Sequence, residues 1–226
     1  MSWLYVNITK PVVDVIVAIA LLVLFSPLML AVIIRAFVKN DRPIFYIAER
    51  MIDLNKSFML IKFRTMRAPE PGECNAGVSG GNKAHRVTEF GKFLRRYRLD
   101  EGPQLVNIIT GSISFVGPRP PLRRYTEKYP EIYGQILKNR PGLTGLATII
   151  YHNHETRLLE RAKTAEETEQ IYVRRCIPRK ARLDLIYQRN ISLRLDLYIV
   201  YLTAAKIFPL PGRRVRRLRR HSGAGL

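Results

Sequence analysis

The sequence has little cysteine and few acidic residues. Its two cysteines, Cys74 and Cys176, lack the spacing of metal ligands, which argues against a disulfide framework and favours a reducing compartment. Asp and Glu together number 18 against 38 Lys and Arg, giving a formal net charge of +20 over 226 residues. This length predicts one domain with appendages. The excess of positive charge predicts an anionic partner: nucleic acid, an anionic membrane face or a phosphorylated substrate.

Sequence patterns of nucleic-acid readers are also missing. There is no zinc finger, helix-turn-helix or RNA-binding signature, and aromatic residues are not interleaved with Lys and Arg in a repeated pattern. We therefore expect no nucleic-acid partner. A membrane-tethered nucleic-acid-binding protein remains an alternative. It predicts an affinity for DNA or RNA that depends steeply on salt, but the positive charge alone would produce the same dependence, so binding by itself would not establish this function.

One long apolar run, residues 15–34, contains no charged residue and is long enough to cross a membrane as a helix. Ser26 and Pro27 interrupt its centre. Pro27 has no backbone N–H and clashes with the Val23 carbonyl, which predicts a kink, and the Ser26 hydroxyl can bond the freed carbonyl. Two topologies remain open: a spanning helix, and a re-entrant hairpin with both ends at one membrane face.

Basic residues flank the apolar run and end the chain. Arg35 and Lys39 follow the run and place the soluble part on the cytoplasmic side. The polybasic stretch 213–220 is interpreted as a contact with anionic lipid heads, and a solvated tail is the close alternative. We predict three parts: a membrane segment at 1–40, a cytoplasmic-face body at 41–208 and a polybasic tail at 209–226.

The body mixes helical patterns with short apolar runs. Strands are expected at 44–47, 58–61 and 114–116, and again after the turn at 141–145. Helices are expected at 88–98 and 155–175. Residues 68–83 are rich in Gly, Pro, Asn and Glu, which predicts a loop that could cover a site. The expected fold class is α/β (α+β): a mostly helical, membrane-associated single domain with a small sheet.

An acidic pair, Asp100-Glu101, follows directly behind three arginines, Arg95, Arg96 and Arg98. Neighbouring like charges are costly unless cations compensate them, and a metal with an anion pocket is one such arrangement. Downstream, a Gly-Pro-Arg-Pro loop holds Arg119. A solvated charge run is the simpler interpretation of an isolated pair, but the surrounding motifs favour a phosphate-handling site.

Taken together, these segments resemble the bacterial sugar transferase family, the monotopic phosphoglycosyl transferases, in a minimal form that has only the catalytic domain. The matching segments follow the family order over nearly the whole chain: Lys10-Pro11 with Asp14, the Ser26-Pro27 break, Glu49-Arg50, Lys62-Phe63-Arg64-Thr65-Met66, residues 91–95, residues 99–105, residues 111–120 and residues 141–147.

The resemblance implies a reaction and a place for it. A UDP-sugar gives its sugar-1-phosphate to polyprenyl (undecaprenyl) phosphate at the cytoplasmic face of the bacterial inner membrane, the first membrane step of polysaccharide or glycoconjugate synthesis. It also implies the re-entrant topology, with the helix broken at Ser26 and Pro27.

The resemblance further implies roles for single residues. Asp100 is the nucleophile, forms a covalent aspartyl-phosphosugar and contacts a Mg²⁺ ion, while Glu101 assists with the metal or with proton transfer. Substrate phosphates are bound by basic side chains: Arg95, Arg119, Lys62 and Arg64. A carboxylate nucleophile that approaches a diphosphate needs such screening by metal and arginines.

The chain departs from the family pattern at a few positions. Ala48, Ile52 and Gly102 replace the usual residues, and His152 stands where the family usually has an arginine. These changes leave the expected chemistry intact, but they leave the specificity for the sugar open. His152 and His154 are expected to be either histidines of a surface loop or substrate contacts. A non-catalytic scaffold that docks anionic lipid is the other alternative, and it needs no acidic pair beside arginines.

Overall fold

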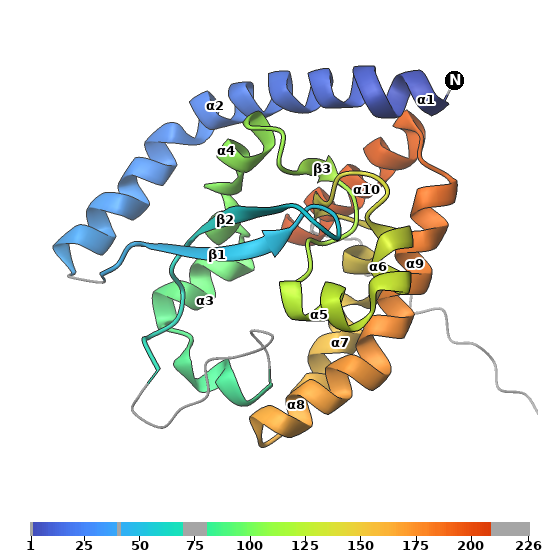
Figure 1. The fold of residues 1–226 in the computed structure, drawn as a ribbon. Coiled ribbons are helices and arrows are strands. Elements are labelled where there is room, and N and C mark those ends of the chain that lie inside the picture. The colour runs from blue at the N-terminus through green and yellow to red at the C-terminus, as the bar shows by residue number, and fades with distance from the viewer. Residues whose placement is uncertain (1, 40–41, 70–80, 209–226) are drawn as a thin grey trace, which may run out of the picture.

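The computed structural model describes residues 2–39, 42–69 and 81–208 (Figure 1). Its helices are α1 (Ser2–Leu4), α2 (Lys10–Val38), α3 (Glu89–Arg96), α4 (Gln104–Ile109), α5 (Arg123–Lys128), α6 (Pro130–Ile136), α7 (Leu146–Leu159), α8 (Ala165–Ile171), α9 (Ile177–Arg189) and α10 (Leu193–Ile207). Its strands are β1 (Phe45–Met51), β2 (Ser57–Phe63), β3 (Ser114–Val116) and β4 (Gly142–Thr144). Shorter helical turns cover Tyr5–Thr9, Gly81–Arg86, Leu99–Glu101 and Tyr172–Cys176.

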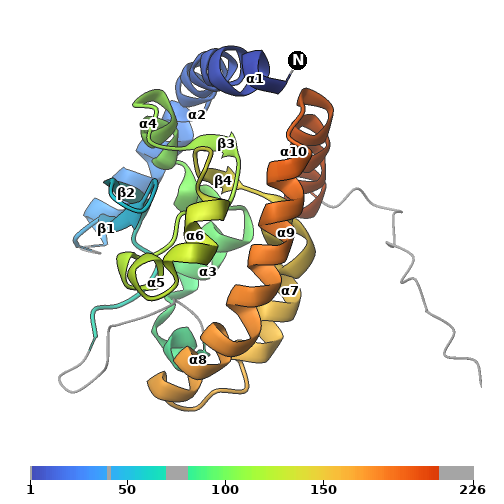
Figure 2. The ribbon, with the colours of Figure 1, turned by 45° about the vertical axis from the view of Figure 1, so that its right-hand side comes forward.

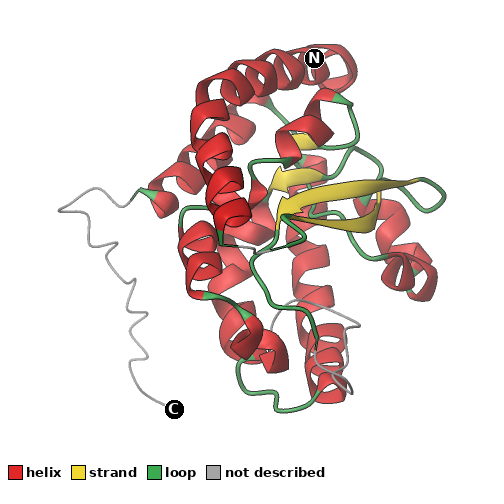
Figure 3. Cartoon of the chain, turned by 90° about the vertical axis from the view of Figure 1, so that its left-hand side faces the viewer, coloured by secondary structure: helices red, strands yellow, loops and turns green. Residues whose placement is uncertain are grey.

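The described part of the chain is mostly helical, as expected, with few strands among the helices (Figure 3). β1 and β2 form an antiparallel hairpin in which Phe45 pairs with Phe63 and Met51 with Ser57. The Asp53 carboxylate closes its turn by accepting two backbone N–H groups. β3 and β4 form a separate parallel pair. The tail at 213–220 and most of the expected loop at 68–83 lie outside the described residues.

Helix α2 is continuous through Pro27, so the expected separation into two short helices is not found. Figure 1 shows that α2 bends along its length without folding back on itself. The Ser26 hydroxyl donates to the Val23 carbonyl at 2.8 Å, as predicted. Because this bond satisfies the carbonyl that proline leaves free, the helix continues past the missing N–H.

One face of α2 contacts the body along most of its length. Ala18 is fully buried in a cluster with Leu105 and Ile108 of α4, and Val32 packs with Phe63 and with Leu94 of α3. The other face is apolar and exposed, with large side chains that include Ile16, Val23, Leu24 and Phe37. The segment Tyr5–Val38 is long and apolar enough to cross a membrane by length and composition.

The second half of the chain differs from expectation in two places. The apolar run after Gly145 is helix α7 and not a strand; a short apolar run alone does not distinguish the two. The single helix expected at 155–175 is interrupted after Leu159, and α8 begins where the Thr164 side chain accepts the Glu167 N–H at 3.1 Å. Helices α7, α9 and α10 lie on the flank opposite the β1–β2 hairpin (Figure 2).

Helix α3 lies close against the segment that follows β2. Thr88 caps the helix by accepting the Gly91 N–H at 2.9 Å. A Cβ on Gly91 would lie 2.1 Å from the Thr65 carbonyl oxygen, so only glycine allows this approach. The contact brings Arg95, near the C-terminal end of α3, to Thr65 just after β2.

Candidate active site

The acidic pair lies in the turn between α3 and α4. Arg98 adopts a left-handed conformation with φ of 54°, and the chain then makes one short turn over Leu99–Glu101. This reversal directs Asp100 and Glu101 inward, where they are 9% and 7% exposed. The predicted pair of carboxylates is therefore buried, which a solvated charge run would not be.

Glu101 is held by three cations. Lys62 Nζ lies 2.8 Å and the Arg119 guanidinium 2.9 Å from Oε1, and Arg98 pairs with Oε2. Burial by itself would raise the pKa of Glu101, but these positive charges lower it well below the usual range. Glu101 is ionised at neutral pH, and it gathers the basic side chains of three separate segments around one point.

Asp100 has a different environment. Within the described residues, no group donates a hydrogen bond or forms an ion pair to its carboxylate. Burial raises the pKa of Asp100 and the adjacent Glu101 charge raises it further, against the attraction of the nearby cations Lys62, Arg95 and Arg98. Its oxygens are free to meet an incoming group.

The other predicted phosphate ligands separate into two sets. Arg95 Nε donates to the Thr65 hydroxyl at 2.9 Å, and its charge interacts with those of Asp100 and Glu101. Arg64 is not brought to the acidic turn, because β2 ends at Phe63 and the alternation that would align it with Lys62 stops there. Arg64 lines a separate cavity with residues of α2 and α3.

Two residues near the site were not singled out by the sequence. Arg98 was visible only as part of a charge run, and its left-handed backbone, which directs it to Glu101, has no sequence signal in a non-glycine residue. Glu155 on α7 forms a 2.9 Å ion pair with Lys180 of α9, and its charge reaches Arg119.

The two histidines lie on helix α7 and not in a surface loop. Desolvation lowers the pKa of His152; the Glu155 carboxylate opposes this, and the charges of Arg98 and Arg119 add to it. The His154 ring contacts Tyr151, with ring centroids 5.2 Å apart. The charge of His152 is thus coupled to the basic side chains around the acidic turn.

The described residues hold no cluster of three or more side chains of the metal-binding types His, Cys, Asp and Glu. A site made wholly by the protein is therefore not present in that part of the chain. Mg²⁺ commonly uses only one or two carboxylates and takes its other ligands from water and substrate phosphates. The Asp100 carboxylate, which has no ion-pair partner among the described residues, fits that donor set. Glu101 already forms ion pairs with three basic side chains.

The chain belongs to the bacterial sugar transferase family, whose model matches residues 5–209. The chain is 32% identical over 206 residues to a UDP-glucose:undecaprenyl-phosphate glucose-1-phosphate transferase of Xanthomonas campestris, a match covering 90% of this chain and 39% of that protein. It is 31% identical to the UDP-N-acetylgalactosamine-undecaprenyl-phosphate N-acetylgalactosaminephosphotransferase of Aeromonas hydrophila, covering 86% of this chain and 42% of that protein.

The chain thus spans about two fifths of the length of these two relatives. Against the exopolysaccharide production protein ExoY of Sinorhizobium fredii it is 33% identical over 210 residues, and the match covers 87% of this chain and 84% of that protein. The acidic turn, Lys62 and Arg119 all lie inside the segment that the family model matches.

Proposed function

We propose that this chain transfers a sugar-1-phosphate from a UDP-sugar to a polyprenyl phosphate at a membrane surface. The names of two relatives describe such a transfer to undecaprenyl phosphate, and that of a third describes exopolysaccharide production. The observation that supports it most directly is the acidic turn, where an unpaired carboxylate, Asp100, lies among cations that a second carboxylate, Glu101, holds in place.

Asp100 acts as the nucleophile. One of its oxygens attacks the phosphorus that carries the sugar, and the bond from that phosphorus to the oxygen of the departing UMP breaks. An oxygen of the lipid phosphate then attacks the same phosphorus, and the Asp100 carboxylate leaves unchanged. Burial and the neighbouring Glu101 charge raise the pKa of Asp100, which makes its carboxylate a stronger base than that of an ordinary aspartate.

Glu101 positions charge and does not transfer protons in this mechanism. With its pKa held well below the usual range, it stays ionised and keeps Lys62, Arg98 and Arg119 facing the reacting phosphates. Arg95 adds a further positive charge near Asp100. These side chains offset the repulsion between a carboxylate and a diphosphate and stabilise negative charge on the leaving UMP.

Mg²⁺ is the expected cofactor, with Asp100 and the donor diphosphate as its ligands. When bound, the ion neutralises phosphate charge and makes phosphorus easier to attack. Excess chelator should abolish transfer and added Mg²⁺ should restore it. Full activity in chelator would mean that the arginines suffice.

In this proposal, helix α2 enters the bilayer from one face and does not cross it. Its first turns are tied to the body: Asp196 of α10 accepts the Tyr5 hydroxyl at 2.7 Å and Lys10 Nζ at 2.5 Å. Its last turns are tied through Val32 and Ala36. A helix crossing the hydrocarbon needs about 20 residues away from the soluble part. Since both ends contact the same body, this arrangement favours a re-entrant position, with the body on the cytoplasmic face.

The names of the relatives give different sugars, so the sugar carried by the donor of this chain has to be found by experiment. Release of UMP from a panel of UDP-sugars, with and without undecaprenyl phosphate, tests the proposal and selects the sugar. UMP release that needs both substrates at catalytic enzyme levels is the expected result. A protein that binds membranes but releases no UMP from any donor would instead be the non-catalytic scaffold.

A further inference from the structure

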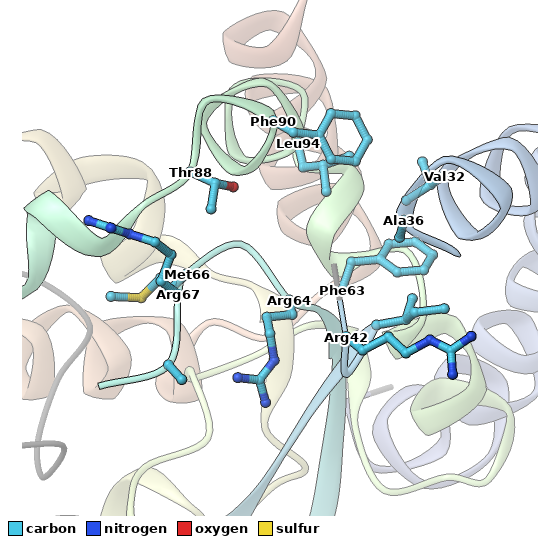
Figure 4. A pocket seen from close by; sticks show the side chains of 12 residues that line it. Val32, Ala36, Arg42, Phe63, Arg64, Met66, Arg67, Thr88, Phe90 and Leu94 are labelled. Carbon is cyan, nitrogen blue, oxygen red and sulfur yellow. The ribbon is translucent and has the colours of Figure 1, made fainter. Parts of the chain in front are cut away.

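The cavity lined by Arg64, of about 240 Å³, lies beside helix α2, and neither Asp100 nor Glu101 lines it. Figure 4 shows its lining: Val32 and Ala36 approach from α2, Phe90 and Leu94 from α3, and Phe63 and Arg64 from the end of β2. Val32, Ala36, Phe63 and Leu94 are all buried, so the cavity has a firm apolar wall that includes the membrane helix itself.

The polar part of this lining is cationic. Three arginines line the cavity, Arg42, Arg64 and Arg67, and none of the described lining residues is acidic. Arg64 Nε is buried and has no hydrogen-bond partner among the described residues. A buried donor without an acceptor is costly, and a bound anion would supply the acceptor. Cations beside an apolar wall suit an anion that carries a hydrocarbon chain.

The cavity adjoins the acidic turn. Leu94 lines the cavity, and the next residue of α3, Arg95, contacts Thr65 and acts on the charge of Asp100. Along the chain, Arg64 lies just after β2 and two residues from Lys62, the partner of Glu101. Leu99 of the acidic turn packs against the same apolar cluster. The cavity and the site of attack therefore share α3 and the end of β2 as their common wall.

Exposed apolar side chains of α2 lie next in sequence to the cavity residue Ala36. On α2, Phe37 and Val38 close to Ala36 are 60% and 72% exposed, and the Arg42 guanidinium lies 4.5 Å from the centre of the Phe37 ring. A hydrocarbon chain that leaves the cavity along this end of α2 would continue over apolar side chains.

We propose that this cavity binds the lipid acceptor: Arg64 and Arg42 bind the phosphate of the polyprenyl phosphate, and its first isoprene units lie against Val32, Ala36 and Phe90. The inference rests on the proposed function, because it assigns that reaction's second substrate to a site of its own. The donor then uses the Lys62, Arg98 and Arg119 side, and the two substrates approach Asp100 from different directions.

The test separates the two half-reactions. Exchange of labelled UMP into the UDP-sugar without acceptor reports attack by Asp100 alone. Full turnover reports the KM for undecaprenyl phosphate. Arg64→Gln should raise that KM about tenfold, the effect of losing one charged hydrogen bond, while UMP exchange keeps its wild-type rate. Ala36→Leu, which fills the cavity without changing charge, should act the same way. Arg161→Gln, at an exposed arginine outside the cavity, is the matched control and should change neither.

Three results would overturn the assignment. An unchanged KM for the acceptor in both cavity variants would mean that the acceptor binds elsewhere. An equal loss of UMP exchange would place the cavity on the donor side. Reduced binding to phosphatidylglycerol vesicles with an unchanged acceptor KM would mean that the cavity holds a phospholipid headgroup instead.

Binding of farnesyl phosphate to the intact protein, measured without donor, decides the proposal independently of turnover. Weaker binding by Arg64→Gln than by wild type supports the cavity even if no UDP-sugar is turned over, in which case only the proposed function fails. Equal binding by wild type and Arg64→Gln overturns the cavity assignment even if turnover is found.

Discussion

At the scale of single residues, two adjacent carboxylates of similar burial have opposite surroundings. Glu101 accepts from Lys62 and Arg119 and pairs with Arg98, whereas Asp100 has no hydrogen-bond partner among the described residues. Their pKa values move in opposite directions for this reason: raised for Asp100, lowered for Glu101. When the surroundings of two neighbouring titratable groups shift their pKa values in opposite directions, the two groups commonly have different roles in catalysis.

The same chemical change at these two positions should therefore have different effects on stability. Glu101→Gln leaves Lys62 and the two arginines without their anion, and we expect it to lower the free energy of unfolding by about 3 kcal/mol. Asp100→Asn loses no hydrogen bond, and we expect a change below about 1 kcal/mol. Chemical denaturation of both variants in detergent measures this. Equal losses would contradict the division of roles.

The stability that Glu101 contributes should depend on pH in a defined direction. Its pKa in the folded protein is lowered, so the contribution is complete above the ordinary glutamate value of 4.5 and is lost as the pH falls from there through the folded pKa. The difference in stability between wild type and Glu101→Gln should accordingly be constant near neutral pH and shrink below about pH 4.5. A stability difference that shrinks as the pH rises above 4.5 would contradict a lowered pKa for Glu101.

The sequence predicted part of this site. Lys62, Arg95 and Arg119 could be assigned because each stands in a motif of the family, and the structure brings all three near the acidic pair. Arg98 could not, since its approach to Glu101 depends on a left-handed backbone that no residue type requires. Arg64 was grouped with Lys62 by strand alternation, and the strand ends one residue too early for that.

At the scale of elements, the proposed membrane contact depends on helix α2, the long apolar helix at the start of the chain. The sequence predicted a long apolar segment here and a bend at Ser26 and Pro27. It did not predict that the helix continues unbroken through the proline. Whether a proline ends a helix or bends it depends on what packs beside it and on whether the freed carbonyl finds a donor. Here the Ser26 hydroxyl supplies that donor, and contacts to α4 and α3 hold both halves.

We expect Pro27→Ala to change the position of this helix in the membrane. The substitution removes the clash with the Val23 carbonyl and restores a backbone hydrogen bond, so the helix can straighten toward a spanning length. Cysteines introduced at Ser2 and at Lys39 report the topology through an impermeant reagent applied to intact cells. Without further change, both cysteines should be protected from the reagent. In the Pro27→Ala background, a fraction of the molecules should be labelled at residue 2, and transfer activity should fall.

Leu28→Ala is the matched control for that experiment, because it changes the neighbouring residue without changing the backbone. It should keep wild-type labelling. Labelling of the Ser2 position from outside in the wild-type background would mean that the helix spans the membrane. Unchanged labelling and activity in Pro27→Ala would mean that contacts with the body, and not the proline, hold the helix in place.

At the scale of the whole molecule, apolar and charged surfaces suggest two kinds of membrane contact. Exposed apolar side chains lie along α2 and also on α10, where Leu197, Tyr198 and Tyr201 are more than half exposed. The chain as a whole carries a net charge of +20. Apolar burial persists in salt, whereas attraction to anionic lipid is screened within about 3 Å at 1 M salt.

We therefore expect the protein to stay bound to vesicles of phosphatidylglycerol and phosphatidylcholine after a wash with ~1 M salt, as measured by flotation. Val23→Lys, at an exposed apolar position of α2, should reduce the retained fraction. Glu160→Lys adds charge at an exposed site just after α7 and serves as the control. Complete release of the wild-type protein by salt would mean that charge alone holds it to the membrane.

The fold class could be predicted from the sequence because the long apolar helix and the turn motifs are local signals. The arrangement around the acidic turn could not, since it depends on contacts between distant segments. Gly91 permits α3 to approach Thr65, and Lys62 and Arg119 reach Glu101 from opposite sides. Such convergence follows from packing, which residue spacing along the chain does not record.

The central claim is that Asp100 attacks the donor and carries the phosphosugar. Incubating the intact protein with its UDP-sugar and Mg²⁺, without acceptor, and measuring its mass tests this most directly. We predict a mass increase equal to one sugar phosphate, located at Asp100 by fragmentation, absent from Asp100→Asn and discharged when undecaprenyl phosphate is added. An adduct on another residue, or continued turnover by Asp100→Asn at the wild-type rate, would contradict the account.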